Sequence, residues 1–217
     1  AGPGGLSAAY ELTRAGLNPL VLERTPAVGD VWRNHYDGVR LNSGRYFSAL
    51  PGSKFPLSAG SWPSREEVVR LLETFPSRGG FAVQTNVDIA RVNYDRERDL
   101  WVITSCDDKC FESRSVVMAI GSCRIPIIPE WEGMESFPGE IIHSSRFKSA
   151  KDFSGKHVLV IGTGNSAAEI ASRLTGYASS VIVSGRTPPY ILPKNIFGIP
   201  LIGIGVWTRG WPSAVVD

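Results

Sequence analysis

The chain has few of the residues on which disulfide-rich and metal-binding proteins depend. Among its 217 residues are three cysteines and three histidines. Cys106, Cys110 and Cys123 match neither a redox Cys-x-x-Cys pair nor the spacing of a zinc site. We therefore expect reduced thiols, no bound metal and a cytoplasmic location.

The sequence also lacks an excess of charge and a long apolar run. Lys and Arg number 23 against 21 for Asp and Glu, and no basic block marks a nucleic-acid interface. The most apolar stretch, residues 196–207, is interrupted by Pro200 and by glycines, whereas a membrane-spanning helix needs about 20 apolar residues. These absences predict a protein with no nucleic-acid partner and no membrane span, and they name no function.

Glycine is abundant, with 23 residues, and one group of glycines opens the chain. Gly2, Gly4 and Gly5 precede apolar residues at helical spacing, and an apolar run at 20–22 then ends in Glu23. Helix, strand and terminal acid in this order are typical of the second half of a dinucleotide-binding βαβ unit. The first glycine of the Gly-x-Gly-x-x-Gly fingerprint, and the strand before it, are missing.

A second glycine group occurs in a complete context. Residues 156–161 predict a strand, residues 162–167 read Gly-Thr-Gly-Asn-Ser-Ala, and helical spacing continues to Gly176 before a strand at 181–183. Glycines let the backbone approach a pyrophosphate, and a helix N-terminus offers unpaired N–H groups and a partial positive charge. The pattern predicts a second dinucleotide site, with a ligand-free glycine turn as the alternative.

The two units differ in the residues directly after their second strand. Glu23 comes after the first and suits a hydrogen bond from a ribose 2′-hydroxyl, whereas Arg186 and Thr187 come after the second. A carboxylate repels a 2′-phosphate and an arginine binds one. The first unit is therefore expected to bind FAD or NAD and the second NADPH, unless Arg186 is an ordinary surface residue.

The region between the two glycine groups is expected to hold a long loop at 38–63, then a helix and short strands. A capping box at 64–67 begins the helix, which is expected to end near Pro76. Strands are expected at 81–85, 89–94, 100–104 and 116–120, the middle two forming an antiparallel meander. Gly121 either lets the backbone meet a ligand or ends the last strand.

Four segments resemble those of flavin-containing monooxygenases. Residues 137–147 resemble the family motif Phe-x-Gly-x-x-x-His-x-x-x-aromatic. Residues 28–33 resemble its Gly-Gly-x-Trp segment beside the flavin, with Asp30 in place of a glycine. Residues 162–170 are similar to the plant YUCCA branch and its bacterial relatives, and 186–188 resemble an Arg-Thr-Pro segment shared with Baeyer–Villiger monooxygenases.

The resemblance implies an α/β fold with two dinucleotide-binding domains of the Rossmann type, the NADP domain being inserted into the FAD domain. Residues 1–150 are expected to form the FAD-binding domain and residues 151–217 the N-terminal part of the NADP-binding domain. Members of the family are considerably longer, so we expect the first strand and a C-terminal part to be missing and this segment alone to be inactive. The oligomeric state is left open.

The resemblance also implies a reaction. In the family NADPH reduces FAD by hydride transfer, the reduced flavin captures O₂ as a peroxyflavin, and one oxygen atom passes to a small organic substrate, here a nitrogen- or sulfur-containing compound or a 2-oxo acid. The alternatives are a Baeyer–Villiger monooxygenase and a non-catalytic, truncated paralogue that binds cofactors. A disulfide reductase of the same architecture needs paired redox cysteines, which Cys106 and Cys110 do not supply.

The resemblance finally assigns residues to each cofactor. The expected FAD site comprises Gly2, Gly5, Glu23, Arg24, Gly29, Val31, Trp32, Arg33, Val87 and Gly121. The expected NADPH site comprises Gly162, Gly164, Asn165, Ser166, Arg186 and Thr187. Asn42 lies where some members place a residue near the peroxyflavin, which makes it the candidate catalytic residue, with a plain turn residue as the alternative. His143 is expected to orient a turn between the domains.

Overall fold

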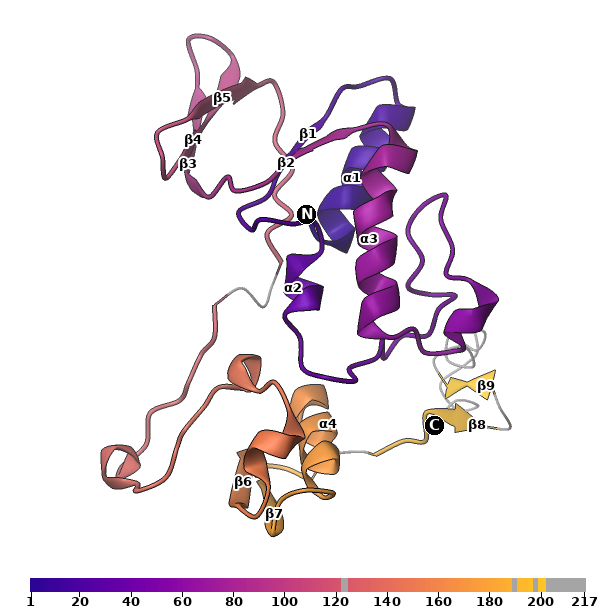
Figure 1. Ribbon diagram of the computed structural model, residues 1–217. Coiled ribbons are helices and arrows are strands. Elements are labelled where there is room, and N and C mark those ends of the chain that lie inside the picture. Colours follow the sequence, from indigo (N-terminus) through magenta and orange to yellow (C-terminus); the bar gives the residue numbers. More distant parts are fainter. Residues whose placement is uncertain (122–124, 189–190, 197–198, 202–217) are drawn as a thin grey trace, which may run out of the picture. The chain divides into compact units, whose positions relative to one another are not determined.

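The computed structural model describes residues 1–121, 125–188, 191–196 and 199–201. Cys123 and most of the apolar stretch 196–207 lie outside these residues. The chain forms two compact units, the first comprising Ala1–Asn34 and Gly38–Arg124 and the second His35–Asp37 and Ile125–Asp217 (Figure 1). The sequence placed a boundary at residue 150. The compact division comes earlier because Phe147 packs against Phe153 in the second unit, with ring centroids 5.6 Å apart.

The first unit begins with helices packed on a short parallel sheet. Its elements are α1 (Pro3–Arg14), β1 (Leu20–Leu22), α2 (Asp30–Arg33), η1 (Leu57–Ala59), α3 (Arg65–Gly79) and β2 (Ala82–Gln84). β1 and β2 pair in parallel, with Leu20 opposite Ala82, and α1 lies beside α3 (Figure 1). Leu6 and Ala9 of α1 meet Leu72 and Phe75 of α3 in one buried apolar cluster. This cluster holds the start of α1 next to the end of β1.

Helix α3 shows how local sequence sets its ends. The Ser64 hydroxyl accepts the N–H of Glu67 at 3.4 Å, and the Glu67 carboxylate accepts the N–H of Ser64 at 2.8 Å, so the predicted capping box is confirmed. The predicted end near Pro76 is wrong, because the helix continues to Gly79. A proline in the last turn removes a single helical hydrogen bond, and Gly80, in the left-handed conformation, closes the helix by donating to the Pro76 carbonyl.

A three-stranded antiparallel sheet completes the described part of the first unit. Its strands β3 (Ile89–Asp95), β4 (Leu100–Ser105) and β5 (Cys110–Ser113) lie in sequence order, which confirms the predicted meander and adds β5, a strand the sequence analysis missed. The expected strand at 116–120 is wrong, because that segment pairs with none of the described strands. A strand needs a neighbour for its backbone N–H and C=O groups.

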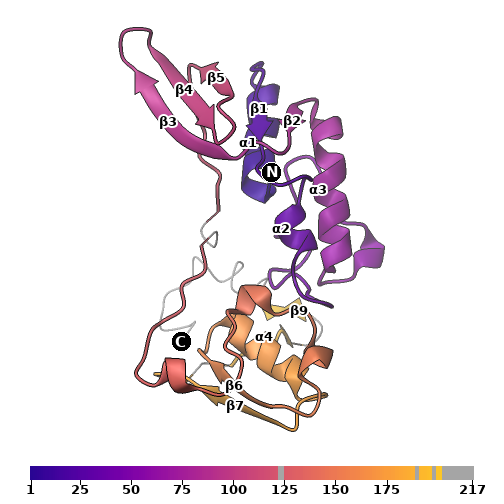
Figure 2. The same ribbon diagram turned by 60° about the vertical axis from the view of Figure 1, so that its left-hand side comes forward.

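The second unit contains the other parallel pair. Its elements are η2 (Met134–Ser136), η3 (Ser144–Arg146), η4 (Ala150–Phe153), β6 (His157–Ile161), α4 (Asn165–Leu174), β7 (Ser180–Ser184), β8 (Asn195–Ile196) and β9 (Ile199–Pro200). β6 and β7 pair in parallel, with His157 opposite Ser180 (Figure 2). One crossover helix between parallel strands is the βαβ arrangement that the sequence predicted.

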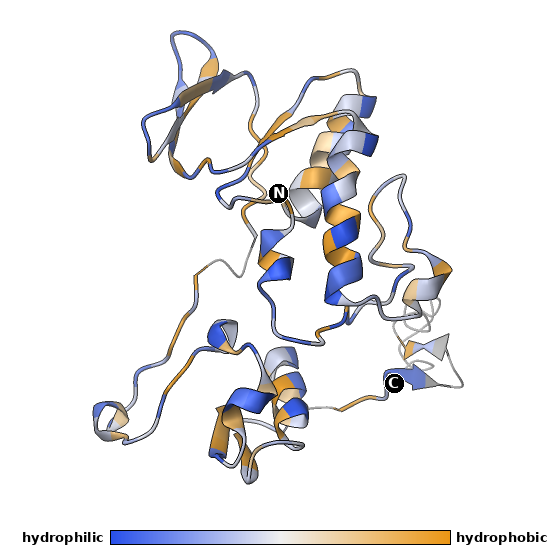
Figure 3. Cartoon of the chain, viewed as in Figure 1, coloured by the Kyte–Doolittle hydropathy of each residue, from blue (hydrophilic) through white to orange (hydrophobic). Residues whose placement is uncertain are grey.

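Helix α4 covers one face of this pair and buries Ile170, Ala171 and Leu174. On the other face Leu159 and Ile182, which are opposite each other in register, stay more than half exposed, and both strands are strongly apolar (Figure 3). The predicted α/β class is confirmed. None of the helices in the described part of the chain is long and apolar enough to cross a membrane.

Candidate functional site: two glycine-bordered helix starts

The turn between β6 and α4 has the geometry of an anion-binding helix start. Gly162 has φ +119°, a conformation that only glycine adopts readily, and its N–H donates to the Ser184 carbonyl at 2.8 Å. Gly164 caps the helix without any side-chain hydrogen bond. Among the described residues no heavy atom lies within 4 Å of the position that a Cβ of Gly164 would take. Asn165 and Ser166 are exposed, so this helix start faces open space.

The end of β7 lies beside the same turn. A Cβ on Gly185 would overlap the Thr163 side chain, so a glycine is required there for the two segments to pack. Arg186 and Thr187 come directly after it and are exposed. The structure thus brings the segment that carries Arg186 and Thr187 next to the predicted pyrophosphate turn. Gly185 is the residue that sequence reasoning missed, and its signal was a glycine directly after a strand.

The first glycine-bordered helix start, at α1, has the same plan with different details. Gly2 caps α1 in an extended conformation without a side-chain hydrogen bond, and Pro3 occupies the first helical position, where no N–H is needed. A Cβ on Gly5 would lie 3.4 Å from the Cβ of Ala119, so Gly5 is in close contact with the segment after β5. A Cβ on Gly2 would meet no described atom within 4 Å.

Glu23 lies at the carboxyl end of β1, next to the start of the chain. One carboxylate oxygen accepts both the N–H and the hydroxyl of Thr25 at 2.9 Å, and the other lies beside the Ala1 nitrogen. The Glu23 carbonyl accepts the N–H of Val87 at 2.9 Å, and the Val87 side chain is buried. The acid, the start of α1 and Val87 are therefore neighbours, whereas Arg24 is exposed.

The segment 28–33 is attached to this first turn. The N–H of Gly29 donates to the Ala1 carbonyl at 3.2 Å. Gly29 has φ +72°, and a Cβ there would lie 3.1 Å from a methyl carbon of Leu72, so both backbone and packing require glycine. The next helix, α2, exposes Val31 and packs Trp32 against the core cluster.

Arg33, at the end of α2, is already engaged by acidic side chains. Its guanidinium donates to Glu73 of α3 at 2.5 Å and lies 3.6 Å from Asp30. The hydrogen bond to Glu73 raises the pKa of Arg33. In this arrangement Arg33 joins α2 to α3. To contact a flavin, Arg33 would have to divide its N–H donors between the flavin and these two acidic residues.

Two predicted residues lie in irregular segments. Asn42 is exposed in the loop after Leu41, and no contact described in the structure links it to the first glycine turn. Gly121 has φ +78° and is exposed with no neighbour within 4 Å of a Cβ. Because residues 116–120 do not form a strand, Gly121 does not end one.

Two residues of the segment 137–147, His143 and Phe147, have a structural role. The Nδ1 of His143 accepts the N–H of Ser145 at 3.2 Å and caps η3. Phe147 is 3% exposed. The expectation that His143 orients a turn agrees with these contacts.

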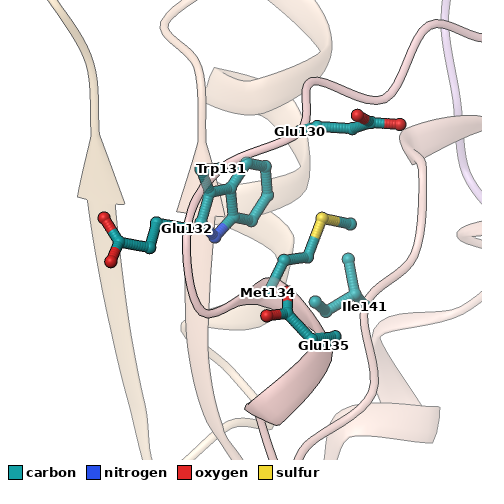
Figure 4. Close-up of a pocket in the computed structure, with 6 residues that line it drawn as sticks. All are labelled: Glu130, Trp131, Glu132, Met134, Glu135 and Ile141. Atoms are coloured by element: carbon teal, nitrogen blue, oxygen red, sulfur yellow. The ribbon is translucent and has the colours of Figure 1, made fainter.

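A broad pocket of about 640 Å³ occurs elsewhere in the second unit (Figure 4). Trp131, Met134 and Ile141 face one another in it, while the Glu132 carboxylate points away (Figure 4). Its lining residues are Glu130, Trp131, Glu132, Met134, Glu135 and Ile141. The charged residues of this lining are all acidic, which disfavours the phosphates of a dinucleotide, and the pocket includes none of the predicted site residues.

The remaining reactive side chains form no alternative centre in the part of the chain that is described. Cys106 and Cys110 are free and exposed at the hairpin between β4 and β5. No group of three His, Cys, Asp or Glu side chains there is placed to hold a metal ion. The two glycine-bordered helix starts, with open space above Gly2 and Gly164, are the places that fit a dinucleotide.

Comparison with known proteins agrees with this geometry. The sequence model of the pyridine nucleotide-disulphide oxidoreductase family matches residues 1–192. Indole-3-pyruvate monooxygenase YUCCA1 of Oryza sativa subsp. japonica is 31% identical over all of this chain and 54% of its own length. The chain spans about half the length of the curated relatives it matches.

Solved structures show the same likeness. A mutant of the flavin monooxygenase from Stenotrophomonas maltophilia is 30% identical with a TM-score of 0.84, the match covering 90% of this chain and 58% of that one. OTEMO, solved in complex with FAD and NADP, is 27% identical with a TM-score of 0.71 over 89% of this chain and 39% of its own. The chain therefore belongs to the pyridine nucleotide-disulphide oxidoreductase family, and it is similar in sequence and structure to flavin-containing monooxygenases.

Proposed function

We propose that this chain supplies the two dinucleotide sites of an NADPH-dependent flavin monooxygenase. FAD would bind at the start of α1 and NADPH at the start of α4. The observation that carries the proposal is the exposed start of α4, with open space above Gly164 and with Arg186 and Thr187 beside it.

The second site is suited to a phosphorylated dinucleotide for two reasons. The first N–H groups of α4 have no side-chain cap, and the helix dipole adds partial positive charge, which favours a pyrophosphate. Arg186 carries a permanent positive charge with a fork of N–H donors and suits the 2′-phosphate that distinguishes NADPH from NADH.

The first site is suited to a dinucleotide without a 2′-phosphate. Glu23 places a carboxylate beside the glycine turn, where it would accept hydrogen bonds from ribose hydroxyls and repel a phosphate. Thr25 holds this carboxylate in place through two hydrogen bonds of 2.9 Å. Gly5, Gly29 and Val87 shape the backbone around it.

The protein's own part in the reaction is to bind and orient the two cofactors and to keep water from them. When bound, NADPH and FAD supply hydride transfer and the activation of O₂, from which one oxygen atom passes to a small organic substrate. The names of the plant relatives favour a 2-oxo acid as that substrate. Asn42 remains the candidate for a side chain near the reacting oxygen.

The first experiment is a reconstitution. The purified full-length protein should turn yellow on incubation with FAD, and anaerobic NADPH should bleach the flavin absorbance. Addition of O₂ and indole-3-pyruvate should restore the oxidised spectrum with formation of product. Protein that stays colourless after reconstitution would instead support a non-catalytic paralogue.

A sharper test uses Gly164. The Gly164→Ala substitution fits the backbone, because φ is −74°, and its methyl group meets no described atom. Stability should fall by no more than about 1 kcal/mol, because alanine is a poorer N-cap than glycine. The methyl group would occupy the space for the pyrophosphate and weaken NADPH binding about tenfold, equivalent to about 1.4 kcal/mol. Binding is measured by fluorescence titration.

The matched control is Gly176→Ala, an exposed glycine of the same unit that also has no neighbour within 4 Å. It should leave NADPH affinity unchanged. Equal affinity of the Gly164→Ala variant and the unaltered protein would show that the pyrophosphate lies elsewhere.

A further inference from the structure

A segment of three residues leaves the first unit and belongs to the second. His35–Asp37 comes shortly after α2 in sequence, yet its contacts group it with the unit that contains α4. The Tyr36 ring is 7% exposed and packs edge-on against Phe147, with centroids 5.5 Å apart. The N–H of Asp37 donates to the Lys148 carbonyl at 2.9 Å. The chain returns to the first unit at Gly38.

Helix α4 also contacts the Tyr36 side chain. The Arg173 guanidinium lies 5.2 Å from the ring centroid, and the Tyr36 hydroxyl is hydrogen-bonded to the Glu169 carboxylate. Arg173 and Glu169 pair with each other at 2.9 Å along the helix. Burial, together with the hydrogen bond to Glu169, raises the pKa of Tyr36, so the hydroxyl keeps its proton and remains a donor. We call Tyr36, Phe147, Glu169 and Arg173 the tyrosine clasp.

The clasp connects two elements that the proposed function assigns to different cofactors. Only Asn34 and His35 separate Tyr36 from the end of α2, and these residues allow a reach of about 10 Å at most. Glu169 lies on the first turns of α4, whose start is the proposed NADPH site. A buried aromatic ring with a charge-assisted hydrogen bond is a firm attachment.

We propose that Tyr36 is a positioning residue that couples α2, on the proposed flavin side, to α4, on the proposed NADPH side. The inference rests on the proposed function. The clasp contacts neither cofactor. It would attach the residues that follow α2 to the unit that contains α4, and we propose that alignment of the hydride donor with its acceptor depends on this attachment.

The coupling predicts a split between binding and reaction. Loss of the clasp should leave the affinity for NADPH within about twofold, because the start of α4 is unchanged. It should slow reduction of the flavin at saturating NADPH by about tenfold, since misalignment acts on the reaction step alone. A change that merely destabilised the fold would not separate the two quantities in this way.

The experiment compares Tyr36→Ala, which removes the ring, with Tyr36→Phe, which removes only the hydroxyl. Hydrogen exchange of the Asp37 amide reports on the clasp without any cofactor, and stopped-flow absorbance reports on flavin reduction. Tyr36→Ala should raise the exchange rate of this amide about tenfold or more, as expected for loss of a buried ring. Tyr36→Phe should give smaller changes in the same directions, and it keeps the test available if the alanine variant does not fold.

Two controls accompany these variants. Tyr46→Phe removes the hydroxyl of an exposed tyrosine in the first unit and should change neither readout. Glu169→Gln keeps an acceptor for the Tyr36 hydroxyl and should retain most of the rate that Tyr36→Phe loses.

Each contrary outcome has a distinct meaning. Unchanged exchange of the Asp37 amide in Tyr36→Ala would show that the clasp does not hold the segment 35–37. Faster exchange of this amide with an unchanged rate of flavin reduction would show that Tyr36 has only a structural role. Either result overturns the coupling. If NADPH fails to reduce the flavin in the unaltered protein, the proposed function fails first and the coupling with it.

Discussion

The two glycine-bordered helix starts share a local plan and differ in how they are attached to the rest of their units. At the start of α1, the Ala1 carbonyl accepts the N–H of Gly29, and a Cβ on Gly5 would lie 3.4 Å from the Cβ of Ala119. At the start of α4, Gly164 faces open space. The capping glycines Gly2 and Gly164 thus both face open space among the described residues, and the two starts differ in that the start of α1 also contacts neighbouring segments of its unit.

The packing behind each start shows the same contrast. The first unit gathers its apolar residues into a cluster that includes Leu6, Leu72 and Phe75. In the second unit Leu159 and Ile182 remain exposed on the sheet face opposite α4. Substitutions at the first start should therefore change stability, and substitutions at the second should change binding.

The largest effect is expected at Gly29. In Gly29→Ala a left-handed backbone costs about 1–2 kcal/mol, and the overlap with Leu72 adds about 1–3 kcal/mol, so the free energy of unfolding should fall by about 3 kcal/mol. Urea unfolding measures it. Gly80→Ala is the control, because Gly80 has a similar φ of +69° and no neighbour within 4 Å. A loss no greater than that of the control would show that Leu72 adjusts without cost.

The next effect concerns the choice between coenzymes. Arg186→Glu should weaken NADPH binding by about 1.5–3 kcal/mol, the scale of a charge-assisted contact, and leave NADH nearly unchanged. Isothermal titration with both coenzymes tests this, with Arg91→Glu on β3 as the matched charge reversal. Equal losses for NADPH and NADH would mean that Arg186 does not contact the 2′-phosphate.

The smallest effect is expected at Glu23. Glu23→Gln keeps an acceptor for Thr25 but removes the negative charge, so FAD affinity should fall by about 1 kcal/mol, the value of one hydrogen bond. NADPH affinity should not change. Flavin release on dilution measures the effect, and the exposed Glu11→Gln is the control. Weakened binding of both cofactors would contradict the separation of the two sites.

Elements with a strong local pattern were predictable from the sequence. The run at 156–161 became β6, and the capping box at 64–67 began α3, because each depends on residues close in the chain. The strand at 116–120 did not form, since pairing requires a partner elsewhere. The continuation of α3 beyond Pro76 also escaped prediction, because buried Phe75 and left-handed Gly80 together outweigh one lost hydrogen bond.

The residues of the candidate site likewise fall into those that local sequence predicted and those that only the tertiary structure showed. Glycine spacing and the residues after each second strand predicted two different dinucleotide sites, since they express backbone freedom and charge within one βαβ unit. The close approach of Gly185 to Thr163 and the engagement of Arg33 by Glu73 depend on contacts between segments that no local pattern contains.

The sequence by itself determined the family, the order of the two βαβ halves and the opposite charges after them, because all three are properties of neighbouring residues. Only the tertiary structure decided that Tyr36 belongs to the unit of α4 and that its ring contacts both Phe147 and Arg173. The physical reason is that an aromatic side chain is buried wherever complementary surface exists, and that surface is assembled here from residues more than a hundred positions away in the chain.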